Sequence, residues 1–499
     1  MQRGATVVTV VLAVLAAGCS GGEDPAPGPE PSSSVPSSPS ASAAPVPARP
    51  DGPVADLSEE LTGGDGPFVG SGDLGAVDPG YAEHEYVAAG RATSYTPVGE
   101  LTGDGRWTFR PGGKARYRTR VLVREPSDPA AASGVVLVEW LNVSGGLDAD
   151  PEFQTLREEV VRQGHTWVGV SAQQIGVEGG PVAVTVDVPG AAGFVGQGLT
   201  SIDPPRYGSL SHPGDAYAYD IYTQVARAVR ARNGDAGPVL AVGESQSAFA
   251  LVTYVNGVQP LTRAFDGFFV HSRGSAPLAL PADGKAADIA GSLFGTPTTF
   301  RTDTEVPVFD VQTETDVAGI LGSAFARQPD TATFRLWEVA GTGHADRHLL
   351  GEAVAGAVDC GPPVNDGPLH VVAKAAFRHL VAWVEDGVAP PSAPVLAYGA
   401  DGVERDRDGI ALDGLRTPPV DVPVRVLSGE PGREDSAVCL LFGSTRPLPR
   451  ARLAEMYPDR AAYVAAYDAG VDEAIAAGYA LEEDRAALEA YRHEELVGP

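Results

Sequence analysis

From about residue 56 onward, short apolar runs alternate with segments whose apolar residues recur every three or four positions. Residues 118–125 alternate between polar and apolar positions, and residues 134–140 contain the unbroken run Val135-Val136-Leu137-Val138. An unbroken run of this kind is typical of a strand buried on both faces of a parallel sheet. The same reasoning predicts further strands at residues 166–170, 238–242, 266–271, 306–313 and 334–340.

The segments between these strands have helical periodicity. Phe153, Leu156 and Val160 share one face of a predicted helix at residues 151–163, and Gly164 ends it. Further helices are predicted at residues 217–231 and 371–384. Strands and helices that alternate at this spacing indicate an α/β fold with a doubly wound, mostly parallel sheet.

Two stretches interrupt the alternation. Residues 174–212 and 275–305 are rich in Gly and Pro, and each follows the end of a predicted strand. Ligands bind at the carboxyl ends of strands in open α/β sheets. We therefore expect both stretches to be cap or lid insertions that shape a pocket. The first is equally compatible with a surface loop that has no such role.

The periodic pattern weakens near the C-terminus. Residues 395–431 contain many turn-forming residues and short apolar runs, and residues 451–494 combine helical periodicity with many acidic residues. Neither stretch shows an obvious core of its own. We therefore expect an extension from about residue 391 that packs against the sheet, as part of one domain spanning residues 56–499.

The first residues of the chain predict export. Arg3 precedes an apolar stretch too short to span a bilayer, which ends in Leu-Ala-Ala-Gly-Cys at Cys19. This ending resembles a bacterial lipobox, so residues 1–18 are predicted to be a lipoprotein signal peptide and Cys19 the lipidated residue. An ordinary cleaved signal peptide is the alternative. Residues 19–55 are almost all Pro, Ser, Ala and Gly and are predicted to be a disordered tether. The expected location is the cell membrane, facing the extracytoplasmic side.

Composition excludes several classes of partner. The chain has 499 residues, with 36 Lys and Arg against 65 Asp and Glu, which gives a formal net charge of −29. This charge argues against nucleic acid as a partner and against electrostatic docking on anionic lipid. The lipid anchor is therefore the expected contact with the membrane. No group of His, Cys and carboxylate residues has metal-ligand spacing, and no Gly-rich loop has nucleotide-site context, so we expect neither metal nor cofactor.

Cysteine use agrees with export. With Cys19 assigned to lipid, Cys360 and Cys439 remain as an even pair in an oxidising compartment. We expect a disulfide between them, and two separate buried thiols are the alternative.

The most informative motif follows the apolar run at residues 238–242. Gly243-Glu244-Ser245-Gln246-Ser247 places a serine between a predicted strand and a predicted helix, with small residues two positions before and after it. This is the pattern of a nucleophile elbow, in which a sharp turn exposes the serine hydroxyl. The alternative is that Ser245 only caps the helix.

A carboxylate and a histidine follow Ser245 in the required order. The predicted strand at residues 306–313 ends at Glu314 and Asp316, and the next strand leads into a Gly-rich loop that carries His344. The order Ser…acid…His is that of α/β hydrolases. We predict a triad of Ser245, His344 and Asp316, with Glu314 as the alternative acid. A structural bond between His344 and Asp346 is the other reading of that histidine.

An acyl-transfer site also needs donors for the oxyanion. We expect one from the backbone N–H of Gln246 and a second from Asn142 or Val143, in the Gly-containing loop after the strand at residues 134–140. His212 and His271 are predicted to be structural, with a place in the pocket lining as the alternative.

Several separate motifs are similar to those of one bacterial family. They lie at residues 139–146, 211–217, 243–248, 270–274, 313–316 and 441–447. Together they resemble the family described as alpha/beta hydrolase domain-containing protein, from about Tyr81 to the C-terminus. The resemblance implies an α/β-hydrolase fold with Ser245 as nucleophile and His344 as base, and it implies no particular substrate. Gly343 stands where the family has Ala before the histidine.

These features together favour an exported serine hydrolase that cleaves carboxylic esters through an acyl-enzyme. Its expected partner is a small-molecule ester. Triad chemistry serves amides and thioesters equally well, so the sequence leaves those substrates open. A lipid-anchored binding protein without catalysis, built on a hydrolase scaffold, is the alternative from a different functional class.

Overall fold

The computed structural model describes residues 49–70, 77–185, 193–234 and 236–498. The chain divides into two units, residues 1–48 and 49–499. The predicted signal peptide, Cys19 and most of the predicted tether lie outside the described residues. The end of that tether, residues 49–55, is described: Arg49 forms an ion pair with Asp266, and the Ala55 N–H donates to the Gln224 carbonyl at 3.1 Å.

A nine-stranded sheet forms the centre of the second unit, with its strands in the order β1-β2-β3-β5-β4-β6-β7-β8-β9. The β1–β2, β2–β3 and β3–β5 pairs are antiparallel, and the remaining pairs are parallel. The predicted α/β fold with a mostly parallel sheet is therefore confirmed. The strands are β1 (Asp56–Glu60), β2 (Tyr81–Pro97), β3 (Phe109–Pro126), β4 (Val136–Trp140), β5 (Thr166–Val170), β6 (Val239–Glu244), β7 (Gly267–His271), β8 (Val308–Thr313) and β9 (Phe334–Val339).

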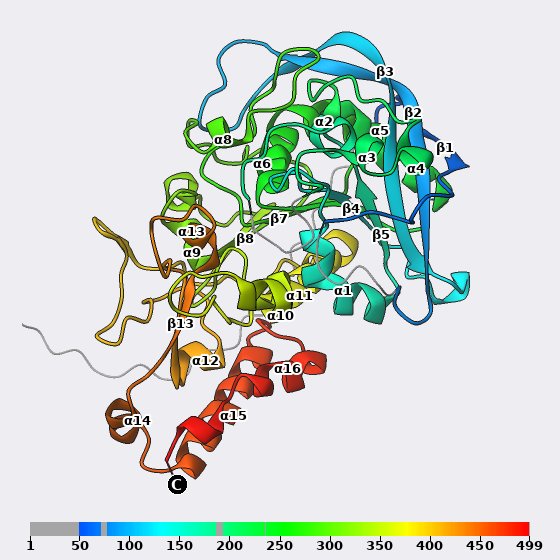
Figure 1. Cartoon of the computed structure of the whole chain (residues 1–499). Helices are drawn as coiled ribbons and strands as arrows, with labels where there is room; N and C mark the ends of the chain where they lie inside the picture. Colours follow the sequence, from blue (N-terminus) through cyan, green and yellow to red (C-terminus); the bar gives the residue numbers. More distant parts are fainter. Residues whose placement is uncertain (1–48, 71–76, 186–192, 235, 499) are drawn as a thin grey trace, which may run out of the picture. The chain divides into compact units, whose positions relative to one another are not determined.

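The antiparallel edge of the sheet was largely missed by the sequence prediction. β2 and β3 form a hairpin of 17 and 18 residues, seen as long curved ribbons in Figure 1. Most of the residues of β2 are half-buried, so its apolar positions form no continuous run. The hairpin therefore lacks the signal that identified the buried parallel strands.

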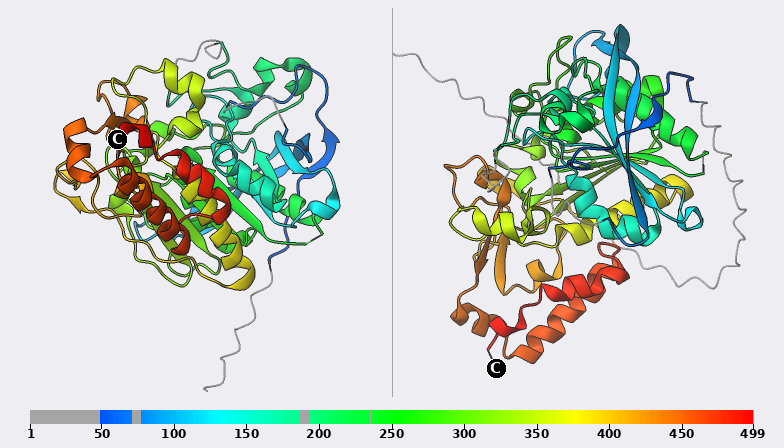
Figure 2. Two further views of the ribbon diagram at one scale, coloured as in Figure 1. Left: turned by 90° about the horizontal axis from the view of Figure 1, so that it is seen from below. Right: turned by 45° about the vertical axis from the view of Figure 1, so that its right-hand side comes forward.

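Helices cover both faces of the sheet (Figures 1 and 2). On one face, α1 (Pro151–Gln163) and α11 (Leu369–Asp386) pack on inward side chains such as Leu137 and Leu240. On the other face, α5 (Ala218–Arg232) and α6 (Gln246–Thr253) pack on neighbours such as Val138. Because successive residues of a strand point to opposite faces, each central strand supplies both cores.

Shorter elements connect and extend this framework. None of the described helices combines the length and the apolar composition needed to cross a membrane. Two small sheets pair β10 (Tyr398–Gly399) with β11 (Gly402–Val403) and β12 (Arg425–Ser428) with β13 (Ser444–Pro447). The remaining helices are α2 (Gln174–Glu178), α3 (Leu199–Ile202), α4 (Pro204–Tyr207), α7 (Gln259–Thr262), α8 (Ile289–Ser292), α9 (Glu314–Val317), α10 (Arg347–Ala357), α12 (Pro418–Asp421), α13 (Cys439–Phe442), α14 (Arg450–Met456), α15 (Arg460–Ala476) and α16 (Arg485–Ala490).

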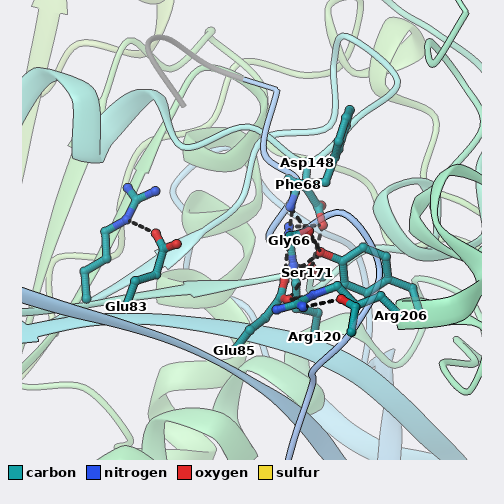
Figure 3. Close-up of polar contacts among 11 residues, drawn as sticks. Gly66, Phe68, Glu83, Glu85, Arg120, Asp148, Ser171 and Arg206 are labelled. Atoms are coloured by element: carbon teal, nitrogen blue, oxygen red, sulfur yellow. Dashed lines mark hydrogen bonds and ion pairs between the residues drawn. The ribbon is translucent and has the colours of Figure 1, made fainter. Parts of the chain in front are cut away.

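A buried ion network fixes the segment that precedes β2. Arg120 of β3 is fully buried, and Figure 3 shows its partners around it. Its guanidinium donates to Asp148 Oδ2 at 2.8 Å, to Glu85 Oε1 at 3.3 Å and to the Phe68 carbonyl at 2.5 Å. A buried charge is costly unless it is paired and hydrogen-bonded. The two carboxylates therefore hold Arg120 in place, and Arg120 in turn holds the backbone at Phe68.

The C-terminal extension has a hydrophobic core, contrary to the expectation that it has none of its own. Val317, Ala340 and Val371, which precede the extension in sequence, join that core and connect it to the sheet. The core was missed because its members are scattered over turns and short helices and form no run. From the extension it includes Leu396, Ile410, Val426, Leu453, Tyr463, Tyr467, Val471 and Leu488.

The predicted disulfide is confirmed. Cys360 and Cys439 are bonded across a sequence separation of 79 residues. The bond ties the segment after α10 to the start of α13, and both cysteines are buried.

Candidate active site

Ser245 lies at a sharp turn between β6 and α6. Its backbone has φ 59° and ψ −123°, a left-handed φ that residues other than glycine rarely adopt. The serine side chain makes no capping hydrogen bond to α6 and is half-buried, whereas the residues on either side of it are buried. The helix-cap alternative therefore does not describe this residue, and the turn presents its hydroxyl as a nucleophile elbow requires.

Small residues allow the strand and the helix to meet at this turn. A Cβ atom at Gly243 would lie 3.1 Å from the Ser247 Cβ and 3.3 Å from the Leu251 Cδ1, closer than side chains normally pack. Ser247 occupies the position where such elbows usually have glycine, and its Oγ donates to the Glu244 carbonyl at 2.8 Å. The larger residue is thus accommodated by a local hydrogen bond.

His344 lies between Ser245 and Asp316. Its Nε2 is 2.9 Å from Ser245 Oγ, and its Nδ1 is 2.6 Å from Asp316 Oδ1. Asp316 is fully buried, and His344 is 4% exposed. With Asp316 ionised, Nδ1 carries the proton and Nε2 accepts the serine hydroxyl, which is the geometry of an activated nucleophile.

The two candidate acids have different surroundings. Asp316 is held by a capping box of α9, in which the Thr313 N–H donates to Asp316 Oδ2 at 2.7 Å. Glu314 instead accepts the N–H groups of Gly341 and Gly429, each at 2.7 Å, and pairs with Arg405. Of the two predicted carboxylates, Asp316 therefore reaches His344 and Glu314 does not.

The loop that carries His344 needs a residue without a side chain before the histidine. A Cβ atom at Gly343 would lie 2.9 Å from the Phe442 carbonyl oxygen and 3.0 Å from the Asn365 Cβ. This close approach explains why the chain has glycine at a position where the resembling family has alanine. Asp346 caps α10 through the Leu349 N–H at 2.9 Å, so the predicted alternative of a His344–Asp346 bond is not what the structure has.

Burial and charge act on the triad in opposite directions. Burial lowers the pKa of His344, but the Asp316 carboxylate and its hydrogen bond outweigh burial and raise that pKa above its ordinary value. Burial raises the pKa of Asp316, but the interaction with His344, together with the hydrogen bond from the Thr313 N–H, lowers it below its ordinary value. The pair therefore favours an imidazolium beside a carboxylate, the charge distribution that forms when His344 takes a proton.

A second buried cluster lies beside the triad. His271 Nδ1 is 3.2 Å from Glu152 Oε2 and 4.0 Å from Glu244 Oε2, and at most 2% of each residue is exposed. Burial raises the pKa of Glu244 to about 7. Burial lowers the pKa of His271, but Glu152 and then Glu244 raise it to about 9.

This cluster was not recognised from the sequence. Its three ligand atoms lie within 4.8 Å of one another, a spacing that could hold a metal ion. The residues come from α1, β6 and β7, so no short-range spacing signals the group. The available hint was Glu244 itself, an acidic residue that ends an apolar strand directly before the nucleophile. His271, predicted to be structural or pocket-lining, is a buried member of this cluster.

The expected oxyanion donors differ in availability. Among the hydrogen bonds of the described residues, the Gln246 N–H has no acceptor. The Asn142 N–H donates to the Ala149 carbonyl at 2.9 Å, and the Val143 N–H donates to the Gln246 Oε1 at 3.1 Å. Both loop residues lie beside the elbow as expected, but their N–H groups are engaged.

A pocket of about 280 Å³ opens at Ser245 and His344. Val184 and Val195 of the first Gly/Pro-rich insertion line it, so this insertion shapes the pocket. The prediction that residues 275–305 do the same was wrong. That insertion packs on α6 instead, where the Leu278 N–H donates to the Phe249 carbonyl at 2.9 Å.

Solved structures similar to this chain include three bacterial or environmental hydrolases. A putative dienelactone hydrolase from Klebsiella pneumoniae is 14% identical, with 60% of this chain and 98% of that chain covered and a TM-score of 0.32. A serine hydrolase without a lid from Xanthomonas campestris is 12% identical, with 59% and 95% covered and a TM-score of 0.29. A cold-adapted esterase from an Arctic intertidal metagenomic library is 12% identical, with 54% and 89% covered and a TM-score of 0.28.

A sequence match to a family model covers nearly the whole second unit of the chain. No curated protein matches the chain in sequence. The family model described as "Alpha/beta hydrolase domain" matches residues 48–490, which include the sheet, the elbow and the C-terminal extension. The predicted α/β-hydrolase fold is thereby confirmed, and the chain belongs to this α/β hydrolase domain family.

Proposed function

We propose that the protein is a serine hydrolase that cleaves carboxylic esters through an acyl-enzyme on Ser245. The observation that carries the proposal is the chain of two hydrogen bonds, Ser245 Oγ to His344 Nε2 at 2.9 Å and His344 Nδ1 to Asp316 Oδ1 at 2.6 Å. The left-handed φ of Ser245 supports the same role, because a strained backbone at a hydroxyl that makes no capping bond is a cost that capping does not explain.

Each triad residue has a defined task in this mechanism. His344 takes the hydroxyl proton as Ser245 Oγ attacks the ester carbonyl, and the resulting imidazolium then protonates the leaving alcohol. Asp316 keeps the Nδ1 proton in place and stabilises the imidazolium. Water, activated by His344 in the same way, attacks the acyl-enzyme and releases the acid.

The oxyanion would be stabilised by two backbone N–H groups. The Gln246 N–H follows the nucleophile directly and is one donor. We assign the second to Val143, whose N–H donates to the Gln246 carboxamide oxygen at 3.1 Å. An alkoxide replaces that neutral acceptor favourably, since a charge-assisted hydrogen bond is about twice as strong as a neutral one. Asn142 would hold the loop through its Nδ2, which donates to the Glu244 carbonyl at 3.0 Å.

The pocket supports an uncharged ester as substrate. Leu147, Leu349 and Leu441 are among the apolar side chains that line it, and Glu244 is the charged residue in its wall apart from the triad histidine. A lining of this kind offers a charged substrate few partners, which favours an uncharged one. Amides and thioesters share the chemistry, so relative rates on matched substrates decide between the three acyl classes.

Export and lipid anchoring belong to the same proposal. The lipobox-like ending at Cys19 and the Pro/Ser-rich residues after it support a membrane-tethered enzyme outside the cytoplasm. The Cys360–Cys439 disulfide is consistent with an oxidising compartment. Accumulation of the precursor in cells treated with globomycin, and in a Cys19→Ala variant, is the expected result. Unchanged processing in both would contradict lipidation.

Ester hydrolysis tests the enzymatic proposal. We expect the purified residues 49–499 to hydrolyse p-nitrophenyl butyrate, and Ser245→Ala to lower kcat by at least about 10³-fold. Ser247→Ala is the matched control, because this neighbouring hydroxyl bonds only to a backbone carbonyl. A correctly folded wild-type protein without hydrolysis would instead favour the binding-protein alternative.

A further inference from the structure

We propose that the site takes esters with an extended apolar chain, and that this chain lies in a groove between α1 and α10 that continues from the pocket at Ser245. The inference rests on the serine-hydrolase function proposed above and names the class of its substrate.

The groove and the catalytic pocket adjoin each other and share part of their lining. The groove has a volume of about 1180 Å³, the pocket about 280 Å³, and both are lined by Gly70, Leu147, Leu349, Leu350 and Val354. Sites for small ligands usually measure roughly 300–1,000 Å³. The pocket alone is at the lower limit of that range, whereas pocket and groove together accommodate a chain that extends well beyond the reacting carbonyl.

One wall of the groove is the apolar face of α10. None of the residues of this helix is buried, and Leu349, Leu350 and Val354 are half-buried where they line the groove. A helix on a globular protein normally buries its apolar stripe in the core. Here the stripe faces the groove, which leaves an apolar surface for a ligand to cover.

The opposite wall adds further apolar contacts. Val161 of α1 lines the groove, and so do Phe68 and Phe194, whose ring centroids lie 5.4 Å apart. The position of Phe68 is fixed, because the buried Arg120 donates to its carbonyl at 2.5 Å (Figure 3). The backbone at this part of the wall is therefore held in place before a ligand binds, which reduces the entropic cost of binding.

Charges in the groove are neutralised within the protein. Arg157 pairs with Asp78 at 2.9 Å, and Arg162 pairs with Asp484 at 2.7 Å. Glu158, also in the wall, pairs with Lys374. Because these charges are paired within the chain, a ligand in the groove needs no charged group to neutralise them. An uncharged aliphatic chain can therefore bind there.

Two substrate series test this proposal. One varies the acyl chain of p-nitrophenyl esters from acetate to decanoate, and the other varies the alcohol of alkyl acetates from ethyl to decyl. Both are used below their critical micelle concentrations with the described unit, residues 49–499. Each buried methylene contributes enough to raise kcat/KM by about threefold, so burial of only two of the methylenes added between four and ten carbons gives a rise of about tenfold, and we expect at least that rise in one series.

A groove-filling variant shows whether α1 and α10 are responsible for such a rise. Val161→Trp should lower the ratio of kcat/KM for the ten-carbon to that for the four-carbon substrate by about tenfold. Gln163→Trp is the matched control, since Gln163 is exposed on the same helix outside the groove. Val354→Phe on α10 provides a second variant if Val161→Trp does not fold.

The outcomes separate this inference from the function on which it rests. Fluorophosphonate labelling of wild-type protein at Ser245 together with flat profiles in both series would overturn the groove and leave the hydrolase standing. A chain-length preference that both groove variants leave unchanged would overturn the groove in the same way. Absence of labelling in folded wild-type protein would overturn the hydrolase itself, and the substrate class with it.

Discussion

Two carboxylates lie two positions apart after β8, yet they contact different partners. Asp316 bonds His344, whereas Glu314 bonds backbone N–H groups and Arg405. We therefore expect Asp316→Asn to lower kcat by roughly 10³–10⁴-fold, because an amide favours the wrong imidazole tautomer. Glu314→Gln should lower kcat by less than about tenfold and act mainly on stability. Steady-state kinetics on folded variants decides between them, and the reverse ranking would mean that the acid is misassigned.

Glu244 makes stability depend on pH. Burial raises its pKa to about 7 in the folded protein, so the folded state keeps a proton that the unfolded chain has released. The protonated Glu244 contributes fully to the free energy of unfolding at acidic pH, below the pKa of this group in the unfolded chain. This contribution is lost as pH rises through about 7. His271, whose Nδ1 lies 4.0 Å from Glu244 Oε2, faces the same carboxyl group, so the two groups titrate as a coupled pair.

The corresponding variant is Glu244→Gln, which removes that titration. Its free energy of unfolding relative to wild type should increase from pH 5 to pH 8, on the order of 1–3 kcal/mol in total. Urea denaturation at four pH values measures the difference. Glu100→Gln, at an exposed carboxyl group, is the control and should show no trend. A pH-independent difference for Glu244→Gln would contradict a raised pKa.

Among individual residues, those that could be predicted from the sequence are the ones that lie in a local sequence pattern. Ser245 and His344 could be named because each sits in a short motif at a strand end, and their order in the chain is diagnostic. Glu152, Glu244 and His271 meet through three separate elements, so their proximity has no sequence signal. The contact between the Gln246 side chain and the Val143 N–H is equally non-local, and it is what engages an expected oxyanion donor.

At the scale of elements, the elbow depends on the absence of a side chain at residue 243. Gly243→Ala would place a methyl group 3.1 Å from the Ser247 Cβ, so β6 and α6 must separate. We expect a loss of about 1–3 kcal/mol in the free energy of unfolding and a slower reaction of Ser245. Gly356→Ala in α10 is the control, since a Cβ there has open space. Equal stability of the two variants in denaturant titrations would show that the close approach is unimportant.

Some elements of the fold could be predicted from sequence patterns and others could not. Buried parallel strands such as β4 and β6 were predicted because both of their faces are apolar. The β2–β3 hairpin was missed because half-buried antiparallel strands form no apolar run. The two Gly/Pro-rich insertions look alike in composition, yet one lines the pocket and the other packs on α6, since composition does not determine where a loop packs.

At the scale of the whole chain, the disulfide joins the catalytic region to the extension. It closes a separation of 79 residues between α10 and α13, and Leu441 and Phe442 of α13 line the pocket. Replacing both cysteines by serine should lower the free energy of unfolding by about 2–5 kcal/mol. Thermal unfolding of the double variant, beside wild type with and without reductant, measures the loss. An unchanged Tm in both experiments would contradict a stabilising role.

The disulfide could be predicted by counting cysteines in an exported chain, without any geometry. The core of the extension could not, because its residues come from turns and short helices far apart in sequence and meet Val317 and Val371 only after folding. Residues 1–48 carry the predicted anchor, and export remains a prediction from their sequence.

In the proposed mechanism, His344 and Asp316 activate Ser245 as a nucleophile. Labelling of residues 49–499 with a fluorophosphonate, followed by mass spectrometry of the modified peptide, tests it most directly. We expect a single phosphonylated residue, Ser245, with no labelling of Ser245→Ala and strongly reduced labelling of His344→Ala. Labelling that persists in Ser245→Ala, or none in folded wild-type protein, would contradict it.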